Sequence, residues 1–369
     1  MITGTPLLRF TWRCALLVAA LWLAGCAAPL RSQLDAYPPV ANDQPPGVSQ
    51  ATQQLARALG RGVSLGNMLE APREGAWGLT VTDELLDAAR NAGFATVRLP
   101  VRWSSHAQAE RPFRIDPVFM ARVVSVVHGL QQRGLRVILN QHHYRHLDGD
   151  PLDEGDPPQH EGLADERFLA LWQQVAERFA TVPDDRLLFE LYNEPHGRLD
   201  AERWNDLMAR AVGVVRRSNP TRALLVGPVR WNNAGELDRL RLPNDGNLVV
   251  VIHHYEPFAF THQGAFWIKP PMPAGVNCCD EAQTQDIRRA LDVAQAWGAR
   301  MRYPVLLGEF GSYKAADLPS RERYTRLVRL EAEKRGLSWI YWELAAHFGI
   351  YDPAARRMRH SLLDALMAP

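Results

Sequence analysis

Short apolar runs alternate with amphipathic stretches from about residue 60 to the C-terminus. Eight of these runs are only four to six residues long, and turn-forming or polar residues bound them. Parallel strands that are buried on both faces have this near-continuous apolar character. The predicted strands are residues 62–66, 95–100, 136–140, 187–191, 223–226, 248–253, 305–308 and 337–342.

The stretches between the predicted strands have apolar residues at helical spacing. The predicted helices are residues 82–92, 117–133, 165–180, 201–218, 281–297 and 319–334. Strands that alternate with helices over this length predict a single (β/α)8 barrel domain, residues 59–369. An open doubly wound sheet is the alternative. It is disfavoured because no GxGxxG or phosphate-binding loop follows any predicted strand.

The N-terminus has the pattern of a targeting segment. Arg9 and Arg13 precede an apolar run at residues 14–23, which is too short to span a bilayer as a helix. The run ends in Leu-Ala-Gly-Cys26, which resembles a bacterial lipobox. We therefore expect residues 1–25 to be a signal peptide and Cys26 to carry a membrane-anchoring lipid. An ordinary signal peptide and an uncleaved anchor are the alternatives.

By resemblance to Gram-negative lipoproteins, Ala27 after the cysteine implies the outer membrane, and hence a location in the cell envelope. Five prolines lie between residues 29 and 46, so residues 26–58 are expected to be the lipidated Cys26 followed by a flexible linker. Only Cys278 and Cys279 remain in the barrel domain. They either form a vicinal disulfide or stay as thiols, and we favour thiols.

Composition narrows the range of partners. Hydrophobic residues make up 46% and charged residues 22% of the chain, which is typical of a globular protein. The net charge is +1, and removal of the signal segment would make it −1. Neither value supports binding to a polyanion, so no nucleic-acid partner is expected. Eleven Trp residues are compatible with stacking on sugars.

Functional side chains of a β/α barrel gather where the strands end. Glu194 follows the fourth predicted strand, and Glu309 follows the seventh. Two carboxylates that face each other across a barrel mouth are the minimum requirement for glycoside hydrolysis, because one can protonate the leaving oxygen while the other attacks or activates water. Further polar residues end the other strands.

The motifs around these carboxylates resemble glycoside hydrolase family 5, from about Arg61 to the C-terminus. They are Asn193-Glu194-Pro195, Gly308-Glu309-Phe310-Gly311, the opening Gly66-Asn67-Met68-Leu69-Glu70, His253-x-Tyr255 and Phe260-Thr261-His262-Gln263-Gly264. The resemblance implies a cleavage site formed by Arg98, His142, Asn193, Glu194, His253, Tyr255, Glu309 and Trp342.

The resemblance also implies roles for the reacting groups. Glu194 would be the general acid/base, and the nearby second carboxylate would raise its pKa. Glu309 would be the nucleophile that forms a glycosyl-enzyme ester, so the enzyme would be retaining. Arg98 would keep Glu309 ionised, and Tyr255 could donate a hydrogen bond to the same carboxylate.

The remaining positions would bind the sugar. Asn193 would bond the 2-hydroxyl, His142 and His253 would orient hydroxyls or carboxylates, and Trp342 would supply a flat apolar floor. Trp77, Trp103, Trp231 and Trp267 are further candidates for stacking or for packing.

Two other functional classes remain open. A metal-dependent hydrolase could use His142, His143 and His146, but adjacent histidines on a strand point to opposite sides. The nearby acidic loop could hold Ca²⁺, although a solvated loop is favoured. A non-catalytic sugar-binding barrel would be expected to have lost Glu194 or Glu309, and both are present.

We therefore expect a monomeric enzyme that needs no metal or cofactor and that has a polysaccharide or oligosaccharide substrate as its partner. Internal cleavage of a β-1,4-glucan is the first choice, and exo action or hydrolysis of another β-glucan or β-mannan is the alternative.

Overall fold

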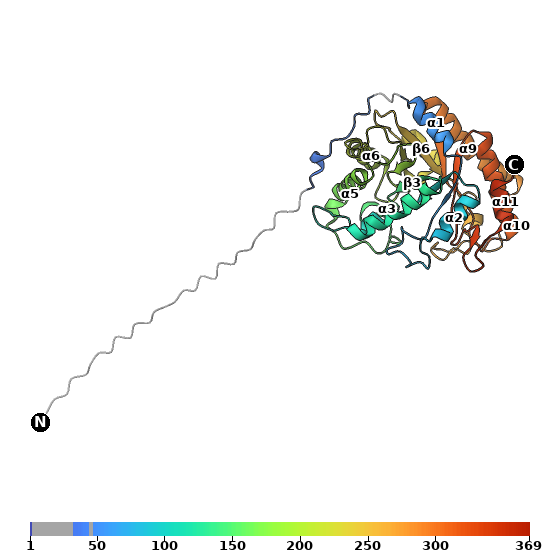
Figure 1. Cartoon of the computed structure of the whole chain (residues 1–369), viewed down its shortest axis with the longest axis horizontal. Helices are drawn as coiled ribbons and strands as arrows, with labels where there is room; N and C mark the ends of the chain where they lie inside the picture. The colour runs from blue at the N-terminus through green and yellow to red at the C-terminus, as the bar shows by residue number, and fades with distance from the viewer. Residues whose placement is uncertain (2–31, 44–46) are drawn as a thin grey trace. The chain divides into compact units, whose positions relative to one another are not determined.

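The computed structural model describes residue 1, residues 32–43 and residues 47–369. Eight parallel strands form a closed barrel in chain order, with β8 paired to β1. Helices surround the barrel (Figure 1). The predicted strands are confirmed to within two residues at each end. They are β1 Arg61–Ser64, β2 Thr96–Leu99, β3 Arg136–Asn140, β4 Leu187–Glu190, β5 Leu224–Val226, β6 Leu248–His253, β7 Val305–Glu309 and β8 Ser338–Tyr341.

The six predicted helices are also present. Thr82 caps the first of them, because its side chain accepts a hydrogen bond from the Leu85 amide. The fifth extends four residues beyond its predicted end and stops where Arg302 takes a left-handed conformation with φ 61°. These helices are α2 Asp83–Asn91, α3 Pro117–Gln132, α5 Ala164–Arg178, α6 Ala201–Arg216, α9 Glu281–Met301 and α10 Leu318–Lys334.

Several short elements lie between the main ones. Most follow the carboxyl ends of strands, where they shape the mouth of the barrel. They are η2 Trp103–His106, α4 Arg145–Asp148, η3 Glu161–Leu163, α7 Val229–Asn232, η4 Ala234–Arg239, α8 Phe258–Thr261, the hairpin β9 Tyr351–Asp352 and β10 Arg357–Met358, and α11 His360–Met367.

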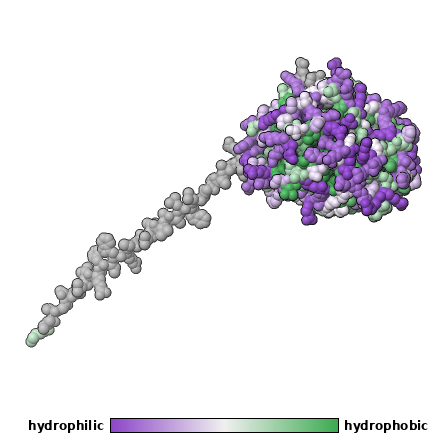
Figure 2. Space-filling model, in the orientation of Figure 1, coloured by the Kyte–Doolittle hydropathy of each residue, from purple (hydrophilic) through white to green (hydrophobic). Residues whose placement is uncertain are grey.

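Strand residues alternate between the barrel interior and the layer under the helices. Ile138, Leu188 and Leu225 belong to the small inner cluster, whereas their neighbours Leu139 and Phe189 belong to the large outer one. Two residues further along β3 and β4, the inward positions become polar. The interior therefore changes from apolar to charged toward the carboxyl ends of the strands. On the face drawn in Figure 2, the surface is mainly hydrophilic.

The prediction of a flexible linker through residue 58 is wrong for its last part. Residues 50–58 form helix α1 (Gln50–Ala58), and the Ser49 side chain caps it by accepting from the Thr52 amide. Ala56 and Leu59 pack into the inner cluster of the barrel. Helix α1 thus buries apolar surface at one end of the barrel. This burial stabilises the helix although the sequence before it is rich in proline.

Residues 32–43, which include η1 (Leu34–Ala36), also lie on the barrel domain. The Gln33 amide donates to Glu166 at 2.8 Å, and the Val40 amide donates to the Ala209 carbonyl at 3.2 Å. Arg210 on α6 donates to the Tyr37 carbonyl at 2.9 Å. We call residues 32–43 the N-terminal strap. The compact unit therefore begins at Ser32.

The proposed signal peptide and Cys26 lie outside the described residues. Within residues 32–43 and 47–369, no helix is long and apolar enough to cross a bilayer. The preference for free thiols is wrong, because Cys278 and Cys279 form a disulfide. The loop ahead of α9 brings the two sulfur atoms together with Cys278 buried, an arrangement that sequence spacing does not specify.

Candidate active site

The two predicted carboxylates face each other at the carboxyl ends of the strands. Glu309 is the last residue of β7, and Glu194 lies four residues beyond the end of β4. One oxygen of each carboxylate and Nδ1 of His253 all lie within 4.8 Å of one another. The Glu194 side chain is 21% exposed and that of Glu309 is 6% exposed. Glu194 is thus the more accessible of the two.

Arg98 on β2 connects the groups beneath this pair. Its Nη1 donates to Glu309 Oε1 and its Nη2 to Asn193 Oδ1, both at 2.6 Å. Burial of the guanidinium would lower its pKa, but the carboxylates of Glu190 and Glu309 outweigh that effect and raise the pKa. A permanent cation therefore lies beside the predicted nucleophile.

Glu190 was not predicted from the sequence. It ends β4 and binds Arg98 at two points, and it also accepts a hydrogen bond from Asn140 Nδ2 at 3.0 Å. The Glu190 side chain is fully buried. A carboxylate inside an apolar strand needs a partner when it is buried, and that is the signal in the sequence that could have found it.

Glu309 is held at both oxygens. Arg98 binds Oε1, and the Tyr255 hydroxyl donates to Oε2 at 2.7 Å, as expected. Burial raises the pKa of Glu309, while Arg98 and the Tyr255 hydrogen bond act in the opposite direction. The two donors therefore favour the charged form that a nucleophile requires.

His253 lies between the two carboxylates. Its Nδ1 is 2.6 Å from Glu194 Oε1 and 3.7 Å from Glu309 Oε2. Burial lowers the pKa of His253 to about 4, so the ring is neutral at pH 7. Asn232 Nδ2, whose orientation is set by donation to the Asn193 carbonyl, faces Nε2 at 3.3 Å. The proton is therefore on Nδ1, which donates to Glu194.

Gly308 makes room for this histidine. A Cβ at residue 308 would lie 2.3 Å from Val251 Cγ2 and 3.1 Å from His253 Nε2. The glycine that precedes the predicted nucleophile is thus a steric requirement. His254, the second residue of the pair, is buried elsewhere and its Nε2 has no partner among the described residues. The choice of His253 as the site residue is supported by this geometry.

Glu194 has the electrostatics of a proton donor. Burial raises its pKa to about 7, and the positive charges of His196 and Arg98 act against the rise. The expected cause, repulsion by the second carboxylate, is wrong, because loss of water is the main effect. Arg98 compensates the charge of Glu309, which explains why that carboxylate contributes little.

His196 is a second residue that sequence reasoning missed. Its Nδ1 lies 2.6 Å from the Glu194 carbonyl, and its Nε2 lies 3.2 Å from Asp150. Burial would lower its pKa, but the bonds to Asp150 and to the carbonyl raise it to about 9. The ring stacks on Trp231 at 4.9 Å and 19°. A protonated imidazole thus donates a hydrogen bond to the backbone carbonyl of Glu194, the predicted acid.

Trp342 stacks on the buried His142 at the carboxyl ends of the strands. Their rings are parallel to within 5°, with centroids 5.4 Å apart. A Cβ at Gly66 would lie 2.8 Å from the Trp342 ring, so the glycine lets the indole approach β1. Burial lowers the pKa of His142 well below its usual value. Trp342 itself stays partly exposed.

The expectation that the adjacent histidines point to opposite sides is wrong. The rings of His142 and His143 lie edge to face with centroids 4.6 Å apart, because both residues follow the end of β3 and the alternation of a strand does not apply to them. His143 Nδ1 pairs with Asp153 at 2.7 Å. Asp148 and Asp153 are 1% and 5% exposed, so the expectation of a solvated acidic loop is wrong for these two residues, whereas Asp150 and Asp156 are partly exposed. Asp148 accepts from the Tyr192 hydroxyl, and hydrogen bonds of this kind compensate its burial.

The other tryptophans differ in exposure. Trp103 is buried and donates to the Asn140 carbonyl, so it belongs to the core. Trp77 is 42% exposed and Trp231 is 52% exposed, whereas Trp267 packs beside Tyr313. In the described part of the chain, the group with metal-like spacing is Glu194, His253 and Glu309. The expectation that no metal is required stays a prediction, which chelation by EDTA would test.

A closed β/α barrel with two clamped carboxylates and an aromatic platform at its mouth defines the chain as a glycoside hydrolase. Comparison with known families specifies the class further. Residues 58–348 match the model of Cellulase (glycosyl hydrolase family 5), and the chain belongs to this family.

Known relatives agree with the assignment. The chain is 32% identical over 324 residues to Endoglucanase H of Acetivibrio thermocellus. The alignment covers 86% of this chain and 33% of that protein. A structure of Thermotoga maritima Cel5A in complex with cellobiose is 39% identical, with a TM-score of 0.80, and covers 85% of this chain and 99% of the other.

The cellulose synthase subunit Z of Clostridioides difficile is 33% identical, with a TM-score of 0.78 and coverage of 84% of this chain and 99% of the other. The chain spans about a third of the length of the first curated relatives it matches.

Proposed function

We propose that this protein is a retaining endo-β-1,4-glucanase in which Glu309 is the nucleophile and Glu194 is the general acid/base. The spacing of the carboxylates carries the proposal, because one oxygen of each lies within 4.8 Å of the other. Retaining enzymes hold the two carboxyl groups about 5–5.5 Å apart, whereas inverting enzymes leave roughly 6.5–9.5 Å for a water molecule.

In the first step, a Glu309 oxygen attacks the anomeric carbon and the glycosidic bond breaks. Glu194 gives its proton to the departing oxygen, so the sugar becomes an ester of Glu309 and Glu194 becomes an anion. Arg98 keeps an ion-pair partner throughout, because it still contacts Glu190 when the charge of Glu309 is consumed.

In the second step, Glu194 removes a proton from a water molecule, and the resulting oxygen attacks the same anomeric carbon. The ester bond breaks, and Glu309 recovers its charge. Two inversions give net retention. Asn193, aligned by Arg98, is assigned to the sugar 2-hydroxyl. The Trp342 ring, which stacks on His142, is assigned to the face of a pyranose ring.

The names of the relatives support the substrate. Several are endoglucanases, and the Thermotoga maritima neighbour is described with cellobiose. A β-mannan is the second candidate, because a structure of the same neighbour at 39% identity contains a mannotriose substrate. The similarity to a cellulose synthase subunit favours a role on a polysaccharide that the cell itself makes.

The location is a proposal that rests on the N-terminal sequence. Cys26 carries a lipid that holds the enzyme at the outer membrane, with a monomeric barrel domain in the cell envelope. In this arrangement the protein contacts the membrane only through the lipid on Cys26, and the barrel domain binds the polysaccharide.

The proposal is tested with the mature chain carrying Cys26→Ser on barley β-glucan, hydroxyethyl cellulose, glucomannan, galactomannan and xylan. An endo-glucanase lowers viscosity long before it releases much reducing sugar. Proton NMR of the first product from a β-1,4-glucan should show the β-anomer, and Glu309→Gln should abolish its formation. An α-anomer that appears first would contradict both the mechanism and the assigned roles.

A further inference from the structure

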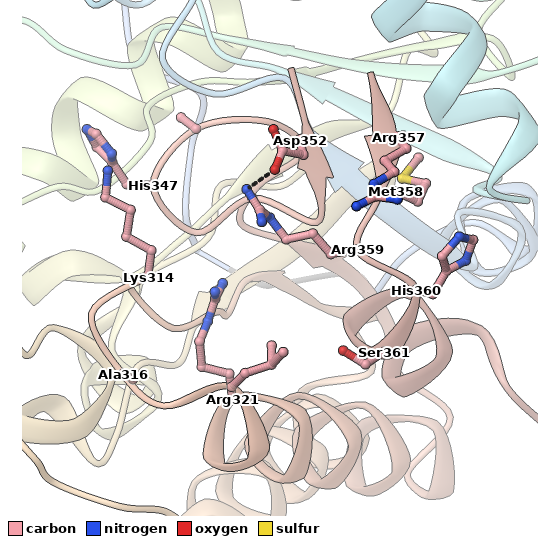
Figure 3. A pocket seen from close by; sticks show the side chains of 13 residues that line it. Lys314, Ala316, Arg321, His347, Asp352, Arg357, Met358, Arg359, His360 and Ser361 are labelled. Atoms are coloured by element: carbon pink, nitrogen blue, oxygen red, sulfur yellow. Dashed lines mark ion pairs between the residues drawn. The ribbon is translucent and has the colours of Figure 1, made fainter. Parts of the chain in front are cut away.

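A cavity of about 690 Å³ lies beside the mouth of the barrel, between the loops that follow β7 and β8. Four permanently cationic side chains line it, and Asp352 supplies the carboxylate among its lining residues. Figure 3 shows these side chains around a common space. The cations are Lys314, Arg321, Arg357 and Arg359. We call this cavity the basic pocket.

The charge of the basic pocket is unbalanced. Arg359 pairs with Asp352 at 3.2 Å, and this ion pair is drawn in Figure 3. Within residues 47–369, no ion pair joins Lys314, Arg321 or Arg357 to a carboxylate. The whole chain carries 42 basic and 41 acidic side chains and is nearly neutral, whereas the lining of the basic pocket has an excess of three positive charges.

Arg321 is the strongest indication of a ligand. Its side chain comes from α10, and only 5% of the residue is exposed. Its Nη2 donates to the Phe348 carbonyl at 2.9 Å, and its Nε lies 3.4 Å from Ser312 Oγ, both neutral acceptors. The guanidinium points into the pocket in Figure 3. A buried guanidinium is costly without an anionic partner, and its planar fork suits a carboxylate or phosphate.

A single loop separates the basic pocket from the candidate active site. The Lys314 amide donates to the His347 carbonyl at 2.9 Å, which ties the pocket wall together. On the other side of this loop, His347 stacks on Trp267 and Phe348 packs against Tyr255. Tyr255 is also the donor to Glu309. His347 and Phe348 therefore link the wall of the basic pocket to the residue that contacts Glu309.

We propose that the basic pocket binds an anionic substituent, such as a uronate carboxylate or an acidic ester group, on a glycan whose backbone occupies the catalytic cleft. This inference rests on the proposed glycanase function and extends it to acidic polysaccharides. Arginine forks give two parallel hydrogen bonds to such groups. The N-terminus of α11 lies at the same pocket, since Arg359, its N-cap residue, makes no side-chain cap and lines the pocket with His360.

The test uses Lys314→Gln/Arg357→Gln, two exposed positions outside the catalytic machinery. The matched control is Arg178→Gln/Lys334→Gln, which removes the same charge at the last turns of α5 and α10. We compare kcat/KM on carboxymethyl cellulose, which is anionic, with that on hydroxyethyl cellulose, which is neutral. The kcat/KM of the pocket variant should fall about tenfold on the anionic polymer and stay unchanged on the neutral one. High salt should abolish this difference. An equal loss on both polymers, or no loss, overturns the proposal.

Binding is measured separately from hydrolysis. Glu309→Gln protein should be retarded in gels that contain carboxymethyl cellulose, and adding the pocket substitutions should remove this retardation. Loss of retardation in the pocket variant supports anion binding by the basic pocket, whether or not the wild-type protein hydrolyses any polymer. A failure of the wild-type protein to hydrolyse any polymer would instead refute the proposed function. Inorganic phosphate and phosphatidylglycerol vesicles test other sources of anions. Loss of binding to either one, with binding to carboxymethyl cellulose unchanged, overturns the glycan assignment.

Discussion

Arg98 and Glu190 form a two-point ion pair inside the barrel, with Nε–Oε2 at 2.6 Å and Nη2–Oε1 at 3.1 Å. Two contacts fix the plane of the guanidinium, so its remaining nitrogen, Nη1, is directed at Glu309. Glu190 thus acts on the predicted nucleophile through Arg98, without contacting the substrate space itself.

Glu190→Gln should therefore change both chemistry and stability. With Glu190 neutral, the charge of Arg98 acts more strongly on Glu309 and lowers its pKa, so the acidic limb of kcat/KM should move to lower pH. Disruption of a buried ion pair should lower the free energy of unfolding by roughly 3–5 kcal/mol. A pH–rate profile and urea unfolding measure the two effects. Glu84→Gln, at an exposed pair with Arg356, should change neither.

Glu194→Ala should separate the two catalytic steps. Hydrolysis of a cellulosic substrate should fall by orders of magnitude, because its leaving oxygen needs a proton. An aryl glycoside with an acidic phenol should lose much less in the first step. Azide can enter the vacated space and attack the ester, so a β-glycosyl azide should accumulate. Its absence, or an α-azide, would remove Glu194 from its assigned role.

His196→Gln should move the alkaline limb of kcat/KM. The pKa of His196 is about 9, so its positive charge at neutral pH opposes the rise in the pKa of Glu194. Loss of that charge should leave Glu194 protonated to higher pH, and the alkaline limb should shift upward. His160→Gln, at an exposed residue, is the control. A downward shift would contradict the sign of this coupling.

The same histidine has a defined effect on stability. Its pKa is raised from 6.5 to about 9 on folding, so protonated His196 contributes stability that is complete below about pH 6.5 and is lost as the pH rises through about 9. In the Gln variant, this part of the pH dependence of unfolding should disappear.

Trp342→Ala should weaken turnover more than folding. The ring is partly exposed and stacked on His142, and its removal should cost about 1–3 kcal/mol of transition-state binding, or roughly five- to 160-fold in kcat/KM. Trp339→Ala, at a fully buried residue, should show the reverse pattern. Thermal unfolding and kinetics of both variants decide whether Trp342 serves the cleft or the core.

Cys26→Ser should release the protein from the membrane fraction and leave its specific activity unchanged. The basis is the lipobox-like sequence at residues 23–26. Cys14→Ser, within the apolar run of the same segment, should not release it. Sedimentation of Cys26→Ser with membranes, as in the wild type, would refute lipidation at this residue.

The strands and the site residues that end them could be predicted because burial on both faces leaves a clear pattern. The apolar runs around Ile138 and Val251 mark strands, and polar residues after such runs mark the barrel mouth. His253 and Trp342 followed from the family motif, since periodicity alone does not distinguish His253 from His254.

The parts that were missed depend on contacts between distant segments. Glu190 acquires its role from Arg98, which is 92 residues away in the sequence. His196 acquires its raised pKa from Asp150 on another loop. Helix α1 has a Ser49 N-cap, but its stability comes from apolar contacts with the barrel interior, which no local pattern reveals.

The N-terminal strap sets a limit on distance. Because the chain is already bound to the barrel domain from about Ser32, six residue steps separate it from Cys26. At about 3.3–3.6 Å per step, their greatest reach is roughly 20 Å. A lipid on Cys26 would therefore tether the barrel domain within a short distance of the membrane. It would work on polymer that passes along the membrane, while strands farther away would be out of range.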